Sequence, residues 1–115
     1  MMEICYIEHK NRNDNGPAWI AAVKRSKSGR TVYFGGKSFQ RYRGIFSNYV
    51  DIETGDEYWI SGVKKDGSDR HWAGSGKIMV DSSILSDYLQ LTGQSSLPKS
   101  RYEIVSLKDE SGIGD

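Results

Sequence analysis

Short β-prone segments separated by glycine turns are the feature that most constrains the fold of this chain. Most of its thirteen glycines lie between Gly29 and Gly76. Glycine within strand-rich sequence marks bulges and tight bends, and a small barrel needs such bends because its sheet must close on itself. The pattern therefore predicts a mainly β, α+β fold, built as a strongly bent antiparallel sheet or a small barrel.

Six to eight segments have the β-branched and aromatic content that is typical of strands, with 38–42 and 49–52 as the weaker candidates. We expect these strands at residues 2–8, 18–26, 30–34, 38–42, 49–52, 57–65, 77–80 and 101–107. One short helix is predicted at about 83–92, because apolar residues recur there at helical spacing. Gly93 suits the position just past the helix end. Three polar residues before the helix can serve as its N-cap: Asp81, Ser82 and Ser83.

At 115 residues the chain is expected to form one domain over 1–107, followed by a polar, frayed tail at 108–115. No apolar run approaches ~18 residues, so we expect no membrane span. Cys5 is the only cysteine, and the N-terminus does not read as a secretory signal. These features predict a cytoplasmic protein without disulfides. Cys5 itself is expected to be a small core residue rather than a nucleophile.

The formal net charge of +1 conceals an uneven layout of charges. Residues 24–43 contain no acid and seven bases: Lys24, Arg25, Lys27, Arg30, Lys37, Arg41 and Arg43. Four acids without a base follow in a turn: Asp51, Glu53, Asp56 and Glu57. Aromatic residues are interleaved with the bases: Trp19, Tyr33, Phe34, Phe39, Tyr42 and Phe46. Exposed aromatics among bases are the chemistry that holds single-stranded nucleic acid. The alternative is that the aromatics form the core and the acidic turn neutralises the bases.

The densest group of functional side chains lies within residues 58–77. It contains Lys64, Lys65, Asp69, Arg70, His71, Trp72 and Lys77. Arg70 and the lysines can bind an anion, and Trp72 can stack on a ring. His71 could act as an acid or base, with Asp69 orienting its ring. The alternative is a structural loop in which Trp72 belongs to the core.

Motif patterns for cofactors and metals do not fit this chain. The stretch from Gly74 to Lys77 ends like a phosphate-binding loop, but His71 stands where that motif needs glycine and Ile78 where it needs Ser or Thr. No spacing of His, Cys and carboxylates supports a zinc or calcium site. We therefore expect no cofactor and no metal.

Three stretches carry a resemblance to a known family: GPAWI at 16–20, SKSGRTVYF at 26–34, and the run at 58–77. They resemble a family of small uncharacterised bacterial proteins, and the resemblance covers most of residues 16–92. Members are often labelled automatically as 1-deoxy-D-xylulose-5-phosphate synthase. The resemblance implies no activity and no site residues. Thiamine-diphosphate enzymes need large α/β domains to hold cofactor and metal, so this chain is too short and too rich in β structure for that label.

The sequence favours a non-enzymatic binding module for an anionic ligand, either nucleic acid or nucleotide-like. The expected contacts are Lys64, Lys65, Arg70, His71, Trp72 and Lys77, joined by Arg25, Arg30 and Arg41 if the faces coincide. One alternative is a protein-interaction or inhibitor domain that uses exposed aromatics as anchors. The other is a small enzyme acting on a phosphorylated substrate through His71 and Asp69.

Overall fold

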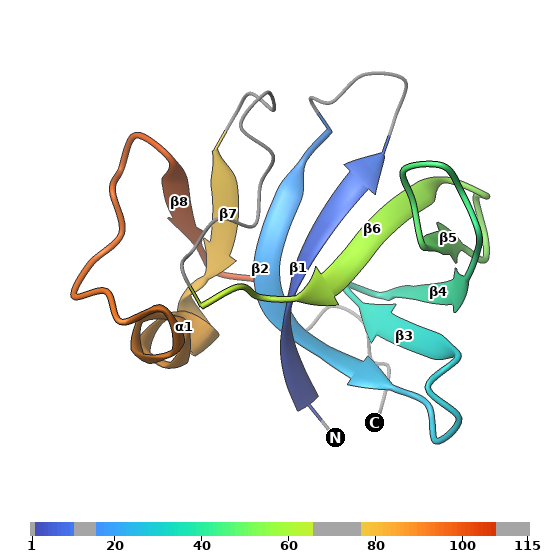
Figure 1. Cartoon of the computed structure of the whole chain (residues 1–115), viewed down its shortest axis with the longest axis horizontal. Helices are drawn as coiled ribbons and strands as arrows, with labels where there is room; N and C mark the ends of the chain where they lie inside the picture. The colour runs from blue at the N-terminus through green and yellow to red at the C-terminus, as the bar shows by residue number, and fades with distance from the viewer. Residues whose placement is uncertain (1, 11–15, 66–76, 108–115) are drawn as a thin grey trace.

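The computed structural model describes residues 2–10, 16–65 and 77–107 (Figure 1). The strands in this part of the chain are β1 (Met2–Lys10), β2 (Ala18–Arg25), β3 (Thr31–Phe34), β4 (Lys37–Arg41), β5 (Tyr49–Asp51), β6 (Glu57–Gly62), β7 (Ile78–Asp81) and β8 (Tyr102–Val105). Between β7 and β8 lie a 3₁₀ turn, η1 (Ser82–Ile84), and the helix α1 (Leu85–Thr92). The predicted strands and helix are all confirmed, although β6 ends at Gly62 instead of Lys65.

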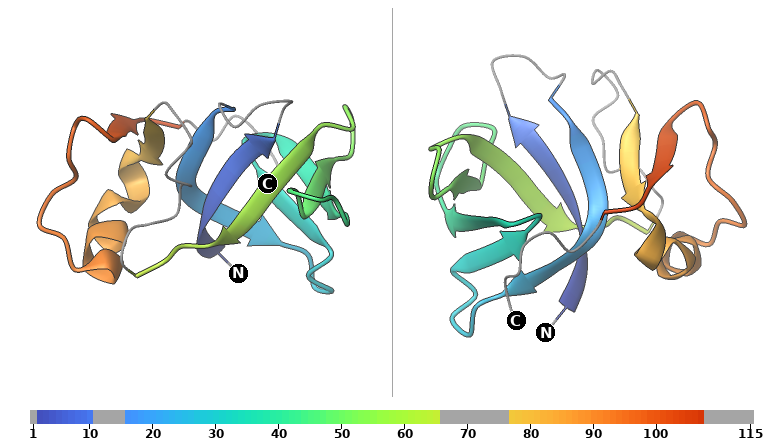
Figure 2. Two further views of the ribbon diagram at one scale, coloured as in Figure 1. Left: turned by 45° about the horizontal axis from the view of Figure 1, so that its top comes forward. Right: turned by 180° about the vertical axis from the view of Figure 1, so that it is seen from behind.

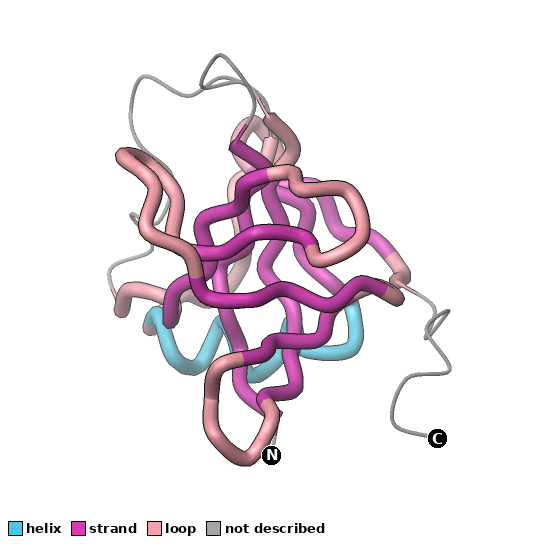
Figure 3. The backbone as a smooth tube through the Cα atoms, turned by 90° about the vertical axis from the view of Figure 1, so that its right-hand side faces the viewer, coloured by secondary structure: helices cyan, strands magenta, loops and turns pink. Residues whose placement is uncertain are grey.

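Strands β1 to β6 form a closed antiparallel barrel. Each strand pairs with the next one along the chain, and β6 returns to pair with β1. Figure 3 shows these strands from the side of the barrel that faces away from α1. The predicted fold class is therefore confirmed. The β3–β4 turn depends on Gly35 and Gly36, whose φ angles of 59° and 78° are strained for other residues.

The inner core fills the barrel. Strand alternation places Cys5 and Ile7 on the inner face of β1, where both are fully buried. The other strands contribute the rest of this cluster: Ala21, Val23, Val32, Phe39, Tyr49, Tyr58 and Ile60. The interior of the barrel is thus filled by packed side chains. The prediction that Cys5 is a core residue is confirmed.

A second layer covers the outside of β1 and β2. Strand β7 pairs with the first residues of β2, and β8 pairs with β7, both in parallel. The sequence predicted mainly antiparallel pairing, and these two pairs are the exceptions. The β7–β8 pair is parallel because η1 and α1 carry the chain back to start β8 at the same end as β7. Figure 2 shows this layer beside the barrel. Its core contains Tyr6, Ala18, Ile20, Ile78, Val80, Ile84, Tyr88 and Tyr102.

The ends of the helix follow the sequence prediction. The side chain of Asp81 caps η1 by accepting a hydrogen bond of 3.2 Å from the backbone N–H of Ser83. Gly93 ends α1 in the left-handed region, with a φ angle of 68°. Among the described residues, no helix is both long enough and apolar enough to cross a membrane. The predicted tail at 108–115 lies outside the described residues.

Candidate functional site

The predicted contact residues fall into three groups in the structure. Lys64 and Lys65 are exposed just after β6, and Lys77 is exposed just before β7. Arg25, Arg30 and Arg41 lie in and around the β2–β3–β4 part of the barrel. The cluster of Asp69, Arg70, His71 and Trp72 lies outside the described residues, so its role stays a prediction.

The half-buried side chain of Arg25 is bound by two partners within the protein. Its Nε donates to Glu3 Oε1 at 2.7 Å, and a terminal guanidinium nitrogen donates to the Tyr49 hydroxyl at 3.1 Å. The hydrogen bond from Arg25 lowers the pKa of Glu3, and the same bond raises the pKa of Arg25. The charged forms of Glu3 and Arg25 are therefore both favoured at neutral pH. Through these two hydrogen bonds Arg25 links β1, β2 and β5 at one end of the barrel.

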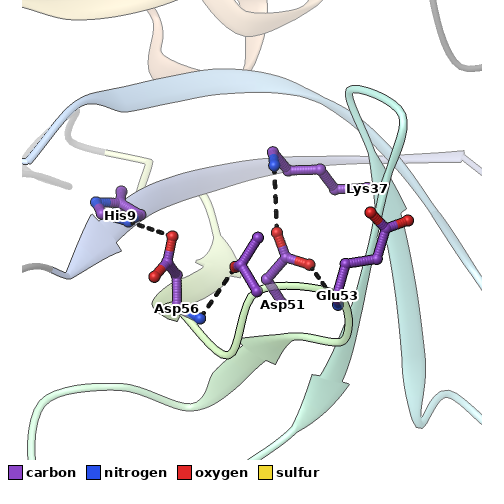
Figure 4. Close-up of polar contacts among 6 residues, drawn as sticks. His9, Lys37, Asp51, Glu53 and Asp56 are labelled. Atoms are coloured by element: carbon purple, nitrogen blue, oxygen red, sulfur yellow. Dashed lines mark hydrogen bonds and ion pairs between the residues drawn. The ribbon is translucent and has the colours of Figure 1, made fainter.

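Lys37 is neutralised by the acidic turn. Its ammonium lies 3.2 Å from Oδ2 of Asp51, whose Oδ1 accepts a hydrogen bond of 2.9 Å from the backbone N–H of Glu53 (Figure 4). Burial alone would raise the pKa of Asp51, which is 2% exposed, but these hydrogen bonds and the lysine charge outweigh burial and lower it. For Lys37, therefore, the alternative prediction holds: an acid of the turn neutralises one of the bases of residues 24–43.

Three other arginines keep their guanidinium groups available, and we call them the basic rim: Arg30, Arg41 and Arg43. All three are exposed. The backbone N–H of Arg41 donates to the carbonyl of Arg30 at 3.2 Å, which brings the β2–β3 turn beside the end of β4. The Arg41 guanidinium lies 5.9 Å from the centroid of the Tyr49 ring. Within residues 2–10, 16–65 and 77–107, no ion pair involves the basic rim.

The loop over residues 42–48 continues directly from Arg41 and exposes large apolar side chains. Ile45 is 89% exposed, Phe46 76% and Tyr42 45%. The backbone N–H of Tyr42 donates to the Asn48 carbonyl at 3.0 Å. The backbone N–H of Gly44 likewise donates to the Ser47 carbonyl at 3.1 Å. Ile45 and Phe46 therefore form the tip of the loop, between Gly44 and Ser47. We call residues 42–48 the aromatic loop.

The aromatic loop is fixed to strand β6 by polar side chains. The Ser47 hydroxyl donates to Glu57 Oε1 at 2.6 Å, and Asn48 hydrogen-bonds the backbone of Ile60. Gly44 suits this position because a Cβ here would overlap the Ser47 hydroxyl and displace it. These contacts with β6 hold the tip of the aromatic loop in place, while the apolar side chains of the tip face solvent.

Sequence reasoning found this region only in part. The interleaving of aromatics and bases was noticed, but the aromatics divide: Phe39 is core, Trp19 and Phe34 pack against the core, and Tyr42 and Phe46 are exposed. Arg43 and Ile45 were not selected as contacts. The run Arg41-Tyr42-Arg43-Gly44 was the available signal, since a glycine after such a run suits a tight turn.

The other end of the barrel carries a second polar group. His9 Nε2 lies 3.3 Å from Asp56 Oδ2 (Figure 4). The His9 ring also meets the Tyr58 ring edge-on, with centroids 4.9 Å apart. In the part of the chain that the structure describes, no three His, Cys, Asp or Glu side chains are placed to hold a metal ion. Burial, followed by the charge of Glu3, raises the pKa of Cys5 to about 12, so its thiol stays protonated at neutral pH.

Comparison of the chain with protein-family models, with curated proteins and with solved structures gives no match. The resemblance to a family of small bacterial proteins therefore stays a prediction. The function has to be argued from the geometry of the basic rim and the aromatic loop.

Proposed function

We propose that this protein is a non-enzymatic binding module whose basic rim holds an anionic, phosphate-bearing ligand, nucleic acid or nucleotide-like. The observation that carries the proposal is the convergence of Arg30 and Arg41, joined through their backbones, with Arg43 two residues further on. Exposed guanidinium groups without acidic partners attract anions locally, even in a chain whose net charge is only +1.

The chemistry of the side chains supports phosphate over other anions. A guanidinium presents a planar fork of donors that fits two phosphate oxygens at once. Arg41 also lies over an aromatic ring, and this contact restricts its side chain before any ligand arrives. Arg25 and Lys37 are excluded from the proposed contact set because Glu3 and Asp51 already bind them.

The first test is a titration with inorganic polyphosphate, comparing the R41A/R43A double variant with the single variant R101A. Arg101 is also exposed but lies at the start of β8, on the other layer of the protein. We expect R41A/R43A to weaken binding roughly tenfold and to reduce the slope of log affinity against log salt by about 2. R101A should bind as the unchanged chain does. Equal binding by the two variants would contradict the proposal.

The two alternative functions stand apart from this site. The small enzyme depends on His71 and Asp69, which lie outside the described residues, and it stays a prediction. A protein-interaction role draws on the exposed tip at Ile45 and Phe46, because large apolar side chains are common anchors at interfaces. That role predicts binding that depends on the tip and not on the basic rim.

A further inference from the structure

We infer that the ligand of the basic rim is an unpaired nucleic-acid strand, whose bases stack on Phe46 and Tyr42 while its phosphates contact Arg41 and Arg43. This inference rests on the proposed function and names its ligand more closely. It is carried by the alternation of exposed aromatic and basic side chains along one fixed loop.

The aromatic loop holds its apolar tip in water instead of burying it. Exposed apolar surface costs roughly 25 cal/mol per Å² relative to burial, yet Ile45 and Phe46 are 89% and 76% exposed. The hydrogen bonds of Ser47 with Glu57 and of Asn48 with Ile60 fix the part of the loop next to these two exposed side chains. A surface ordered before binding loses less entropy when a ligand arrives, so the arrangement suits a binding site.

Aromatic and basic side chains alternate along the aromatic loop. Tyr42 lies between Arg41 and Arg43 in the chain, and its ring edge comes within 3.1 Å of where a Cβ of Gly44 would stand. The Tyr42 ring therefore lies close against the turn that presents Phe46. Aromatic faces next to guanidinium groups match the two chemistries of a single strand, whose bases offer flat apolar faces and whose backbone offers phosphates.

Other anionic macromolecules match this surface less well. In a duplex the base faces are stacked on each other, so an exposed ring gains nothing by stacking unless the duplex is kinked. An acidic membrane would attract the arginines, but the tip offers only two strongly exposed apolar side chains, and stable membrane anchoring needs more buried apolar area. Duplex DNA and acidic vesicles therefore serve as contrasting probes in the test.

The test measures the affinity of the full chain for four probes by fluorescence anisotropy or vesicle sedimentation. The probes are a short oligothymidylate, an abasic strand of the same length, a duplex of that length, and phosphatidylserine-containing vesicles. The variants are F46A, F46W, I45A and R41A/R43A. Ile45 is the matched control for Phe46, because it is the neighbouring tip residue and is even more exposed but has no aromatic face.

Stacking predicts a distinct pattern across these variants. F46A should weaken binding of the oligothymidylate by about 5- to 150-fold and leave binding of the abasic strand unchanged. F46W should bind at least as tightly as the unchanged chain, and I45A should change the affinity by less than about 3-fold. R41A/R43A should weaken both strands. Unchanged thermal unfolding of F46A would confirm that the exposed substitution leaves the fold intact.

Three results would overturn the inference. If F46A and I45A bind the oligothymidylate equally well, no base stacks on the ring, although polyphosphate binding would leave the proposed function standing. If the duplex binds as tightly as the single strand, or if vesicles bind tightly and both tip variants abolish that binding, the ligand class is wrong. If neither strand nor polyphosphate binds, the proposed function itself fails.

Discussion

The side chain of Asn48 pairs with the backbone of Ile60 as a neighbouring strand residue would. Its Nδ2 donates to the Ile60 carbonyl at 2.7 Å, and its Oδ1 accepts from the Ile60 N–H at 2.8 Å. The backbone N–H of Asn48 also donates to the Tyr58 carbonyl at 3.0 Å. The amide thereby extends the pairing of β5 with β6 by one residue and attaches the aromatic loop to the barrel wall.

This pairing predicts that N48D destabilises the protein. Aspartate keeps an acceptor for the Ile60 N–H but places an oxygen where the amide donated to the Ile60 carbonyl. We expect a loss of about 1–3 kcal/mol in the free energy of unfolding at pH 7, measured by urea titration. The control is Q40E, which adds the same charge on the exposed Gln40 of β4 and should change stability by about 0.5 kcal/mol or less. Equal stability of the two variants would show that the Asn48 pairing contributes nothing.

Gly44→Ala is expected to disturb the aromatic loop by overpacking. The added Cβ would overlap the Ser47 hydroxyl and crowd the carboxylate of Glu57, so the hydrogen bond between these two residues must move. We expect a cost of about 1–3 kcal/mol and weaker binding at the tip. Gly62→Ala is the matched control, because its Cβ would meet nothing closer than 3.9 Å, at Glu3 Oε2. Comparable unfolding midpoints for the two variants would rule out a special role of Gly44.

The ion pair of Lys37 with Asp51 should make stability depend on acid pH. The folded pKa of Asp51 is lowered relative to about 3.9 in the unfolded chain. Its stabilisation is therefore complete above pH ~4 and is lost as the pH falls through the folded pKa. We expect D51N to be less stable than the unchanged chain by about 1–3 kcal/mol at pH 7, and the difference to shrink as the pH falls below about 3.9. A difference that stays constant with pH would contradict this account.

Cys5 should be inert in the folded protein. Its side chain is fully buried in the barrel, and its pKa is raised to about 12, so a thiol reagent at pH 8 should react only in step with unfolding by urea. Because the unfolded thiol ionises near pH ~8.5, the buried thiol stabilises the fold below that pH, and this contribution is lost as the pH rises towards 12. C5A should lessen the alkaline loss of stability. Fast labelling of the native protein would show that the barrel opens.

Local patterns were enough to predict the elements of this fold. The barrel strands are short segments rich in β-branched and aromatic residues, and glycines mark several of the turns, so residue order alone places most boundaries within a few residues. Asp81 and Gly93 likewise identified the two ends of the helical segment. The parallel pairing of β7 with β2 was not predictable in this way, since these two strands are far apart in the chain and no local pattern records which strands become neighbours.

The candidate site, like the fold, was only partly predictable from the sequence. The sequence by itself determined that seven bases and several aromatics would lie within residues 19–46, and that one glycine would stand just after Arg43. Only the tertiary structure decided which of these side chains are free. Glu3 reaches Arg25 across 22 positions and Asp51 reaches Lys37 across 14, because barrel closure brings distant strands together. Which strands become neighbours decides that two bases are neutralised and that Phe39 is buried, and the loop between β4 and β5 leaves Phe46 exposed.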